Sequence, residues 1–324
     1  MVDAGSIDLP DVLLAGLLEG NVRALSRSIS CVENHDANAE AIIRGAYSRS
    51  INAWVLGVTG GTGSGKSTLV DALAESYRRE GKTVGVVAVD PSSPFSGGAL
   101  LGDRVRMQRH ATDSGVFIRS MASRGAGGGL AASTYDVVTL MAAAAWNQLI
   151  IETVGVGQEE LDVAGVAHTT CVVLTPAGGD SVQAIKAGIM EIGDVVVLNK
   201  SDIAGADRAY AQLRAAVSHA PGSDWVPPLV RTVATEGQGI DDLRVAISEH
   251  RDWAEDGGRV DTKRREVAGL RLRSIIAATI WQRAWSCRPE EERVRILNEV
   301  ATGRTDPYTA AKELIAQVQA GGSK

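Results

Sequence analysis

The stretch GGTGSGKST, from Gly60 to Thr68, matches the pattern G-x-x-x-x-G-K-S between Gly60 and Ser67. In a glycine-rich turn of this kind, successive main-chain N–H groups point inward at phosphate oxygens, and the following helix adds the positive end of its dipole. We expect Lys66 to reach the β- and γ-phosphates of a nucleotide and Ser67 to bind Mg²⁺. The predicted phosphate-binding residues are Gly61, Thr62, Gly63, Ser64, Gly65, Lys66, Ser67 and Thr68.

The residues on both sides of this loop read as a strand and a helix. Trp54 to Thr59 is a short apolar run typical of a buried strand, and Leu69, Leu73 and Tyr77 follow at helical spacing. A phosphate-binding loop belongs between a strand and a helix, so the flanking sequence supports this interpretation.

The region from residue 53 to about residue 250 alternates short β-branched runs with helical segments. Continuous apolar runs are typical of parallel strands that are covered on both faces. We therefore predict an α/β fold of the P-loop NTPase type, with a doubly wound, mostly parallel sheet and a ligand beyond the carboxyl ends of its strands. The further predicted strands are Val84–Val89, Gly115–Ile118, Gln148–Ile151, Thr170–Leu174, Asp194–Leu198 and Leu229–Thr232.

Helical patterns flank this region on both sides. Apolar residues recur at three- and four-residue steps in residues 9–50, which predicts a helical N-terminal extension over residues 1–50 and a P-loop domain over residues 51–255. Residues 256–324 read as three helices, of which the first has a broad apolar face. That C-terminal segment either packs as an extension or forms a dimer or partner interface. The interface alternative is suggested by Trp281 and Trp285, because a small helical core does not need two such large side chains.

Composition and charge exclude several classes of partner. The formal net charge of -6 gives no basic excess to neutralise the phosphates of a nucleic acid. The three cysteines (Cys31, Cys171 and Cys287) are far apart and lack metal-ligand spacing, as in a reduced intracellular protein. From the acidic N-terminus we expect no export signal, and the longest apolar stretch, Val137 to Ile151, is too short to span a bilayer. We expect a soluble, cytoplasmic protein without a nucleic-acid or membrane partner.

A second motif indicates which base is bound. Asn199, Lys200 and Asp202 form N-K-x-D directly after a predicted strand. An aspartate at this place accepts hydrogen bonds from N1–H and the exocyclic amine of guanine, a donor pair that adenine lacks, while the stem of Lys200 stacks on the base. The predicted nucleotides are therefore GTP and GDP.

A third motif lies after the predicted strand that ends at Ile151. Glu152 and Gly155 occupy the place where P-loop GTPases carry D-x-x-G, whose carboxylate holds Mg²⁺ or its water and whose glycine N–H faces the γ-phosphate. The acid here is a glutamate, one carbon longer, which favours contact with the metal through water.

Two further aspartates are candidates for the same site. Asp90 ends a predicted strand, and Asp103 lies in a glycine-flanked segment after it. Either could join the metal shell or orient the attacking water, although capping or solvated aspartates occur in the same positions.

Together with the phosphate loop and NKSD, four longer segments resemble those of the MeaB/ArgK-type GTPases, a family that includes the chaperones associated with methylmalonyl-CoA mutase. The resemblance covers roughly residues 40–250, and its four segments are DPSSPFSGGALLGDRVRM (Asp90 to Met107), SRGAGGGL (Ser123 to Leu130), ETVGVGQEE (Glu152 to Glu160) and PAGGDSVQAIKAGI (Pro176 to Ile189). It implies a G-protein chaperone that binds a cobalamin-dependent acyl-CoA mutase, gates delivery of adenosylcobalamin by GTP hydrolysis, and protects the mutase. It also implies a homodimer formed through the C-terminal helices.

Residue by residue, the resemblance assigns phosphate and Mg²⁺ binding to Lys66 and Ser67, and the metal and water environment to Asp90, Asp103 and Glu152. By the same resemblance the segment from Gly178 to Lys186 is a switch loop that responds to the mutase, with Asp180, Gln183 and Lys186 as its polar residues.

One loop departs from the family pattern. Val233 stands where such GTPases often have the serine of an S-A pair near guanine. Recognition from this loop would then rest on main-chain groups such as the N–H of Ala234.

The residues themselves leave alternatives open. No glutamine directly follows Gly155 to orient the attacking water, and the next glutamine, Gln158, is three residues further on. We therefore expect slow intrinsic hydrolysis that a partner accelerates. A metal-inserting GTPase for a nickel enzyme would share the motifs but lacks support from any Cys/His pair near a glycine loop. A kinase for a small molecule or a transport component would use the same phosphate loop, and a non-catalytic scaffold would require a degraded site. Methylmalonyl-, ethylmalonyl- and isobutyryl-CoA mutases are all possible partners.

Overall fold

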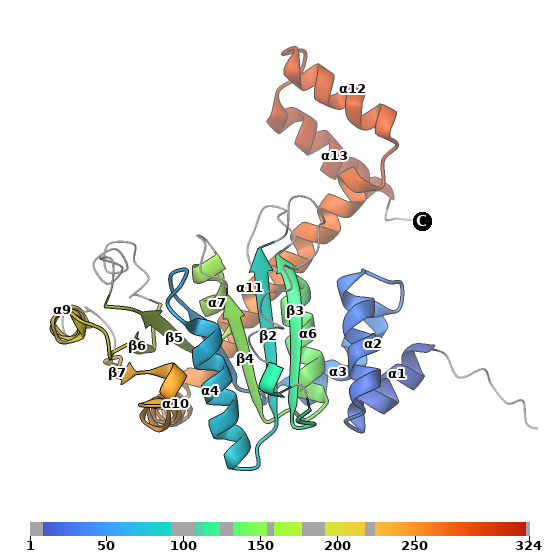
Figure 1. Ribbon diagram of the computed structural model, residues 1–324. Coiled ribbons are helices and arrows are strands. Elements are labelled where there is room, and N and C mark those ends of the chain that lie inside the picture. The colour runs from blue at the N-terminus through green and yellow to red at the C-terminus, as the bar shows by residue number, and fades with distance from the viewer. Residues whose placement is uncertain are drawn as a thin grey trace, which may run out of the picture. The chain divides into compact units, whose positions relative to one another are not determined.

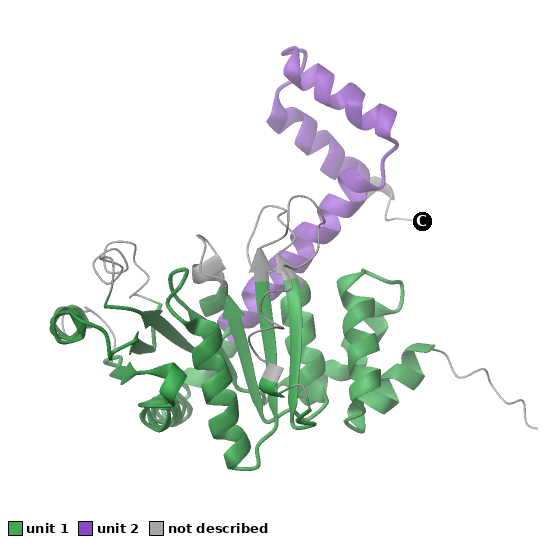
Figure 2. Ribbon diagram, viewed as in Figure 1, with its two compact units in different colours: residues 1–264 green, residues 265–324 purple. Residues whose placement is uncertain are grey.

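Seven parallel strands form the central sheet of the computed structural model (Figure 1). The structure describes residues 9–91, 108–110, 112–123, 132–153, 159–176, 192–217 and 224–321. The chain divides into two compact units, residues 1–264 and residues 265–324, which Figure 2 shows in green and purple.

The strand order is β3-β2-β4-β1-β5-β6-β7, and every adjacent pair among these strands is parallel. The chain thus places β2, β3 and β4 on one side of β1 and β5, β6 and β7 on the other, which confirms the predicted doubly wound sheet. The strands are β1 (Val55–Thr59), β2 (Val84–Pro91), β3 (Val116–Ser123), β4 (Gln148–Thr153), β5 (Thr169–Leu174), β6 (Val195–Asn199) and β7 (Leu229–Thr232).

Helices cover both faces of the sheet because alternate strand residues point to opposite sides. In β1, Leu56 and Val58 lie in the apolar core that includes α4 and α10, while Val55 lies in the core that includes α6 and α7. A third core packs α9 against β5 and β6. The helices of this unit are α1 (Leu9–Leu18), α2 (Val22–Glu33), α3 (Ala39–Ser50), α4 (Lys66–Arg79), α6 (Ala132–Ala143), α7 (Glu159–Val166), α9 (Ala206–Val217) and α10 (Ile240–Glu255), and α11 (Arg259–Trp281) begins in it.

The N-terminal helices α1, α2 and α3 pack against α6, as the blue and green ribbons of Figure 1 show. Leu13 and Leu17 of α1 are buried in the same core as the inner face of α6. Asn21 caps α2, since its side-chain oxygen accepts from the N–H groups of Arg23 and Ala24. The predicted helical extension is confirmed.

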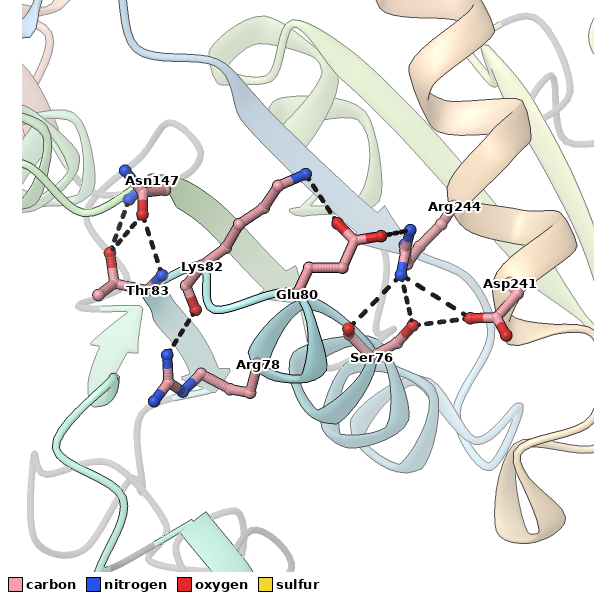
Figure 3. Close-up of polar contacts among 8 residues, drawn as sticks. All are labelled: Ser76, Arg78, Glu80, Lys82, Thr83, Asn147, Asp241 and Arg244. Atoms are coloured by element: carbon pink, nitrogen blue, oxygen red, sulfur yellow. Dashed lines mark hydrogen bonds and ion pairs between the residues drawn. The ribbon is translucent and has the colours of Figure 1, made fainter.

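Polar contacts fix the distal end of α4 to its neighbours (Figure 3). Arg244 of α10 donates to Ser76 Oγ at 2.9 Å and pairs with Glu80, while Ser76 Oγ donates to Asp241 at 2.8 Å. Lys82 pairs with the same Glu80 at 3.0 Å. This network holds the end of α4 opposite the phosphate loop.

A hydrogen-bonded chain joins the amino ends of three strands to α10. Trp54 Nε1 donates to Thr169 Oγ1 at 2.9 Å, and Thr169 Oγ1 lies 2.9 Å from His250 Nδ1. The other ring nitrogen of His250, Nε2, lies 3.3 Å from Asp194 Oδ1, so the chain of polar contacts continues to the residue before β6.

His168 lies beside this chain and is held neutral. Its Nδ1 accepts the main-chain N–H of Val55 at 3.2 Å, and its ring lies 5.1 Å from that of Trp54. Burial lowers the pKa of His168 to about 4, and the positive charges of Arg264 and Lys263 add to this effect.

We expect the free energy of unfolding to decrease as the pH falls below about 6.5, because His168 then becomes protonated in the unfolded chain but stays neutral in the folded protein. The contribution is fully present above pH 6.5 and is lost progressively as the pH falls through about 4, by about 3 kcal/mol in total. Urea unfolding between these pH values measures it. His168→Asn keeps an acceptor for Val55 without a titrating ring, so its curve should be flatter by this amount. An equal slope in both proteins would contradict the assignment.

The described part of the second unit, residues 265–321, consists of helices joined by short turns. It contains the remainder of α11, a π-helical turn (Gln282–Ser286), α12 (Glu290–Ala301) and α13 (Pro307–Gly321). Arg288 joins these elements through bonds to Ala284 O at 2.6 Å, Glu292 at 2.5 Å and Gln317 at 2.6 Å.

No residue along the whole described length of α11 is buried. Trp281 is 61% exposed, and its ring lies 5.8 Å from that of Trp285. The other exposed apolar residues of α11 are Leu270, Leu272, Ile275, Ile276 and Ile280. None of the helices in the described ranges is long and apolar enough to cross a membrane.

Candidate nucleotide site

The loop between β1 and α4 has the backbone that its glycines predict. Gly60 and Gly65 have φ angles of 139° and 89°, which residues with a Cβ atom rarely adopt. A Cβ atom on Gly60 would lie 2.1 Å from the carbonyl oxygen of Val173, and one on Gly65 would lie 2.4 Å from Asn199 Nδ2. The glycines thus permit both the turn and the close approach of two neighbouring strands.

Lys66 is the first residue of α4 and is only 5% exposed. Its Nζ donates to the carbonyl oxygens of Gly60 at 2.7 Å and Gly61 at 3.0 Å. The ammonium group is therefore held inside the loop, at the positive end of the helix, where an anionic ligand is favoured.

Ser67 and Glu152 are brought together by the pairing of β1 with β4. Val58 of β1 is in register with Glu152, so the end of β4 lies beside the start of the loop. Ser67 Oγ donates to Glu152 Oε1 at 2.5 Å, and both side chains are buried. A hydroxyl and a carboxylate oxygen are the hard donors that Mg²⁺ prefers.

Asn199 links the two halves of the site. It ends β6 and is buried, and its Nδ2 donates to the carbonyl oxygen of Ser64 in the phosphate loop at 2.9 Å. Its Oδ1 accepts from Thr232 Oγ1 at 3.0 Å and from the N–H of Ala234 at 3.2 Å. One side chain therefore ties the phosphate loop to the loop after β7.

Lys200 adopts a φ of 56°, an unusual conformation for a residue with a side chain. Its Nζ donates to the carbonyl oxygen of Gly63 at 2.8 Å, so its stem extends along the phosphate loop. Strained backbone of this kind is concentrated at binding sites, since the surroundings must hold it.

A cavity of about 200 Å³ lies beside these loops. It brings together Asp202 and Lys200 of the N-K-x-D motif with Ala234 of the neighbouring loop, as expected for a site that encloses a base. The remaining lining residues are Gly65, Thr68, Asn199, Ile203, Val233 and Thr235.

The other predicted residues are placed less fully. The backbone of Asp90 lies near the carboxyl end of β2, one residue beyond Val89, which pairs with Thr153 of β4. Asp103, Gly155, Asp180, Gln183 and Lys186 lie outside the described residues. Within the described ranges, no three His, Cys, Asp or Glu side chains are grouped so that they could hold a metal ion by themselves.

Three buried threonines of the site were not predicted. Thr153 Oγ1 donates to Thr59 Oγ1 at 3.2 Å, which joins the ends of β4 and β1 next to Glu152. Thr232 supports Asn199 from the end of β7. The sequence does show a threonine at the last position of each of these strands. The partner of each hydroxyl could not be predicted, because it depends on which strands are neighbours in the sheet.

The doubly wound sheet, the phosphate loop that opens α4 and the cavity lined by N-K-x-D together define the chain as a P-loop GTPase. Residues 25–288 match the family described as methylmalonyl Co-A mutase-associated GTPase MeaB. The chain belongs to this family, which confirms the resemblance seen in its motifs.

Three similar proteins agree with this membership. A protein of Pyrococcus abyssi that carries a GTPase name is 44% identical over 316 residues, covering 96% of this chain and 98% of that protein. The GTPase ArgK of Escherichia coli is 34% identical, covering 77% of this chain and 78% of ArgK. A crystal structure described as a LAO/AO transport system kinase superposes with a TM-score of 0.71 and 26% identity, covering 96% of this chain and 97% of that one.

Proposed function

We propose that this GTPase is a chaperone of a cobalamin-dependent acyl-CoA mutase, with methylmalonyl-CoA mutase as the first candidate. GTP hydrolysis would gate the delivery of adenosylcobalamin to the mutase, and the chaperone would protect the mutase. The observation that carries the proposal is the match of residues 25–288 to a family described as associated with that mutase.

The geometry supports specific roles for the residues of the site. Lys66, held at the start of α4, is proposed to bind the β- and γ-phosphates. Asp202 and Lys200, which line the cavity, are proposed to bind guanine together with Asn199 and Ala234. Hydrolysis requires each of these groups to be placed before the γ-phosphate is attacked.

Mg²⁺ is proposed to bind next to Ser67 and Glu152, because their oxygen atoms are buried, adjacent and of the type that the ion prefers. When bound, it would neutralise negative charge on the β- and γ-phosphate oxygens. Asp90 and Asp103 are proposed to complete the metal and water environment, and Gly155 is proposed to contact the γ-phosphate. Asp180, Gln183 and Lys186 are proposed to respond to the mutase.

A homodimer through the C-terminal helices is part of the proposal. The support is the exposed apolar surface of the second unit, which includes Trp281 and Ile276 of α11 and Tyr308 of α13. Exposed apolar patches of this kind mark protein interfaces, and a second copy of the same surface is the simplest partner for them.

Phosphate release with GTP and with ATP, in the presence and absence of methylmalonyl-CoA mutase, tests the proposal. We expect turnover of GTP and not of ATP, and an acceleration of about tenfold or more when the mutase is added, since partners complete the sites of slow GTPases. An unrelated protein at the same concentration serves as the control. GTP turnover that no cobalamin-dependent mutase changes would overturn the chaperone proposal and leave the GTPase in place.

A kinase for a transport component is the second candidate. It is favoured by the similarity to the crystal structure described as a LAO/AO transport system kinase. The two functions differ in where the γ-phosphate goes, because a kinase transfers it to an acceptor and a GTPase releases it to water. Labelled γ-phosphate recovered wholly as inorganic phosphate would exclude the kinase.

A further inference from the structure

Thr232, the last residue of β7, contacts both sides of the turn that carries N-K-x-D. It is in register with Asn199 at the end of β6 and is only 1% exposed. Its hydroxyl donates to Asn199 Oδ1 at 3.0 Å, and its carbonyl oxygen accepts from the main-chain N–H of Ser201 at 3.1 Å. One residue therefore holds the residue before Lys200 and the residue after it.

Lys200 needs such a clamp because of its backbone. Its φ of 56° lies in the left-handed region, which costs free energy for a residue with a side chain. A conformation of this kind persists only where the surrounding contacts fix it. Two further bonds lie within the turn, since Ser201 Oγ donates to the carbonyl oxygen of Leu198 at 2.7 Å and the N–H of Ile203 donates to that of Lys200 at 3.2 Å. The bonds of Thr232 differ from these because they tie the turn to the neighbouring strand.

The side chain of Asn199 depends on the same hydroxyl. Its Oδ1 accepts from Thr232 and from the N–H of Ala234 at 3.2 Å, so both lone pairs of this oxygen are used. Its Nδ2 donates to the carbonyl oxygen of Ser64 in the phosphate loop. Asn199 is buried, so loss of one donor leaves its oxygen poorly satisfied and the whole amide less firmly held.

Thr232 acts on the site from behind it. Among the described residues, those that line the cavity include Asn199, Lys200 and Asp202, but not Thr232. Its contribution is therefore to the position of the residues that line the cavity, and not to a contact with the ligand.

We propose that Thr232 is a positioning residue for the guanine nucleotide, which keeps the N-K-x-D turn in its binding conformation through Asn199 and Ser201. The inference rests on the proposed binding of guanine by this turn and extends it to a residue outside the cavity. A protein whose binding conformation is populated for only a fraction of the time binds its ligand more weakly by that fraction. Loss of the clamp therefore raises the dissociation constant, while Lys66 and Ser67 keep their own contacts in the phosphate loop.

The test is the dissociation constant for a fluorescent GDP analogue, together with the rate of a single turnover of GTP with the full-length protein in large excess. Thr232→Val keeps the β-branched shape that suits a strand and removes the hydroxyl. It should weaken GDP binding about tenfold, mainly through faster dissociation, while the single-turnover rate stays within about twofold. Thr232→Ser restores the hydroxyl and should bind GDP within about threefold of the unmodified protein.

Thr169→Val is the matched control. Thr169 is also a buried strand threonine whose hydroxyl contacts two side chains, those of Trp54 and His250, but it begins β5 at the amino end of the sheet. Its replacement should lower the urea concentration at the midpoint of unfolding and leave GDP affinity unchanged. An equal loss of GDP affinity in Thr169→Val and Thr232→Val would overturn the proposal, because it would follow from reduced stability alone.

Unchanged GDP affinity in Thr232→Val, or a serine variant as weak as the valine variant, would also overturn it. If the hydroxyl acts through Asn199, the double variant Asn199→Ala/Thr232→Val should bind GDP no more weakly than Asn199→Ala alone, whereas additive losses would contradict that route. Equal affinity of the unmodified protein for GDP and ADP would instead overturn the assignment of guanine on which the inference rests.

Discussion

Lys66→Ala should abolish measurable GTP binding and lower GTP turnover on the order of 1,000-fold, because the charge that compensates the β- and γ-phosphates is removed. The side chain is buried inside the loop. Its two carbonyl partners, Gly60 and Gly61, would lose their donor as well. Titration with a fluorescent GTP analogue and a phosphate-release assay measure both effects.

Lys82→Ala is the matched control for this variant. Lys82 lies just beyond the other end of α4 and pairs with Glu80, so its loss removes one lysine without touching the phosphate loop. Its nucleotide affinity should equal that of the unmodified protein. Tight GTP binding by a folded Lys66→Ala protein would show that this loop is not the phosphate site.

Asp202→Asn should weaken GTP binding about 100-fold and improve the binding of xanthosine triphosphate. In the proposed complex the carboxylate would accept two hydrogen bonds from guanine, and an amide in its place would present a donor to a donor, which leaves buried polar groups unpaired. Xanthine carries a carbonyl where guanine has its amine, so the amide suits it. Displacement of one bound fluorescent analogue by GTP and by xanthosine triphosphate measures the change in nucleotide preference.

Asp207→Asn provides the comparison, since Asp207 is an exposed aspartate at the start of α9 that pairs with Arg231 and does not line the cavity. It should leave the preference for GTP intact. GTP affinity unaffected by Asp202→Asn would mean that guanine is recognised elsewhere.

Short motifs made much of the site predictable. The phosphate loop and N-K-x-D each place their polar groups within a few consecutive residues, so Lys66, Ser67 and Asp202 could be proposed as site residues before their surroundings were known. Glu152 was proposed as a site residue because it directly follows an apolar strand, and in the structure it contacts Ser67. The parallel sheet followed from its continuous apolar runs, which only strands covered on both faces require.

Contacts between distant segments could not be predicted in the same way. The hydroxyl pair Thr59 and Thr153 depends on β1 lying next to β4, and Asp71 of α4 pairs with Arg109 only because the chain before β3 returns along α4. β3 itself extends to Ser123, beyond its predicted end at Ile118. The polar residues after Ile118 interrupt the apolar pattern, so the longer strand was not predicted. They are tolerated because β3 is an edge strand whose Arg119 pairs with Glu33 of α2.

Asn199 has a consequence for how the nucleotide is gained and lost. Its amide nitrogen holds the phosphate loop and its oxygen holds the loop beside the base cavity, so ordering one loop also orders the other. If the nucleotide binds as proposed, we expect its polyphosphate and nucleoside halves to be thermodynamically linked, since each half would lower the entropic cost of fixing the protein around the other. A nucleotide bound in this way should dissociate as one cooperative unit, without a state in which only one of its ends is released.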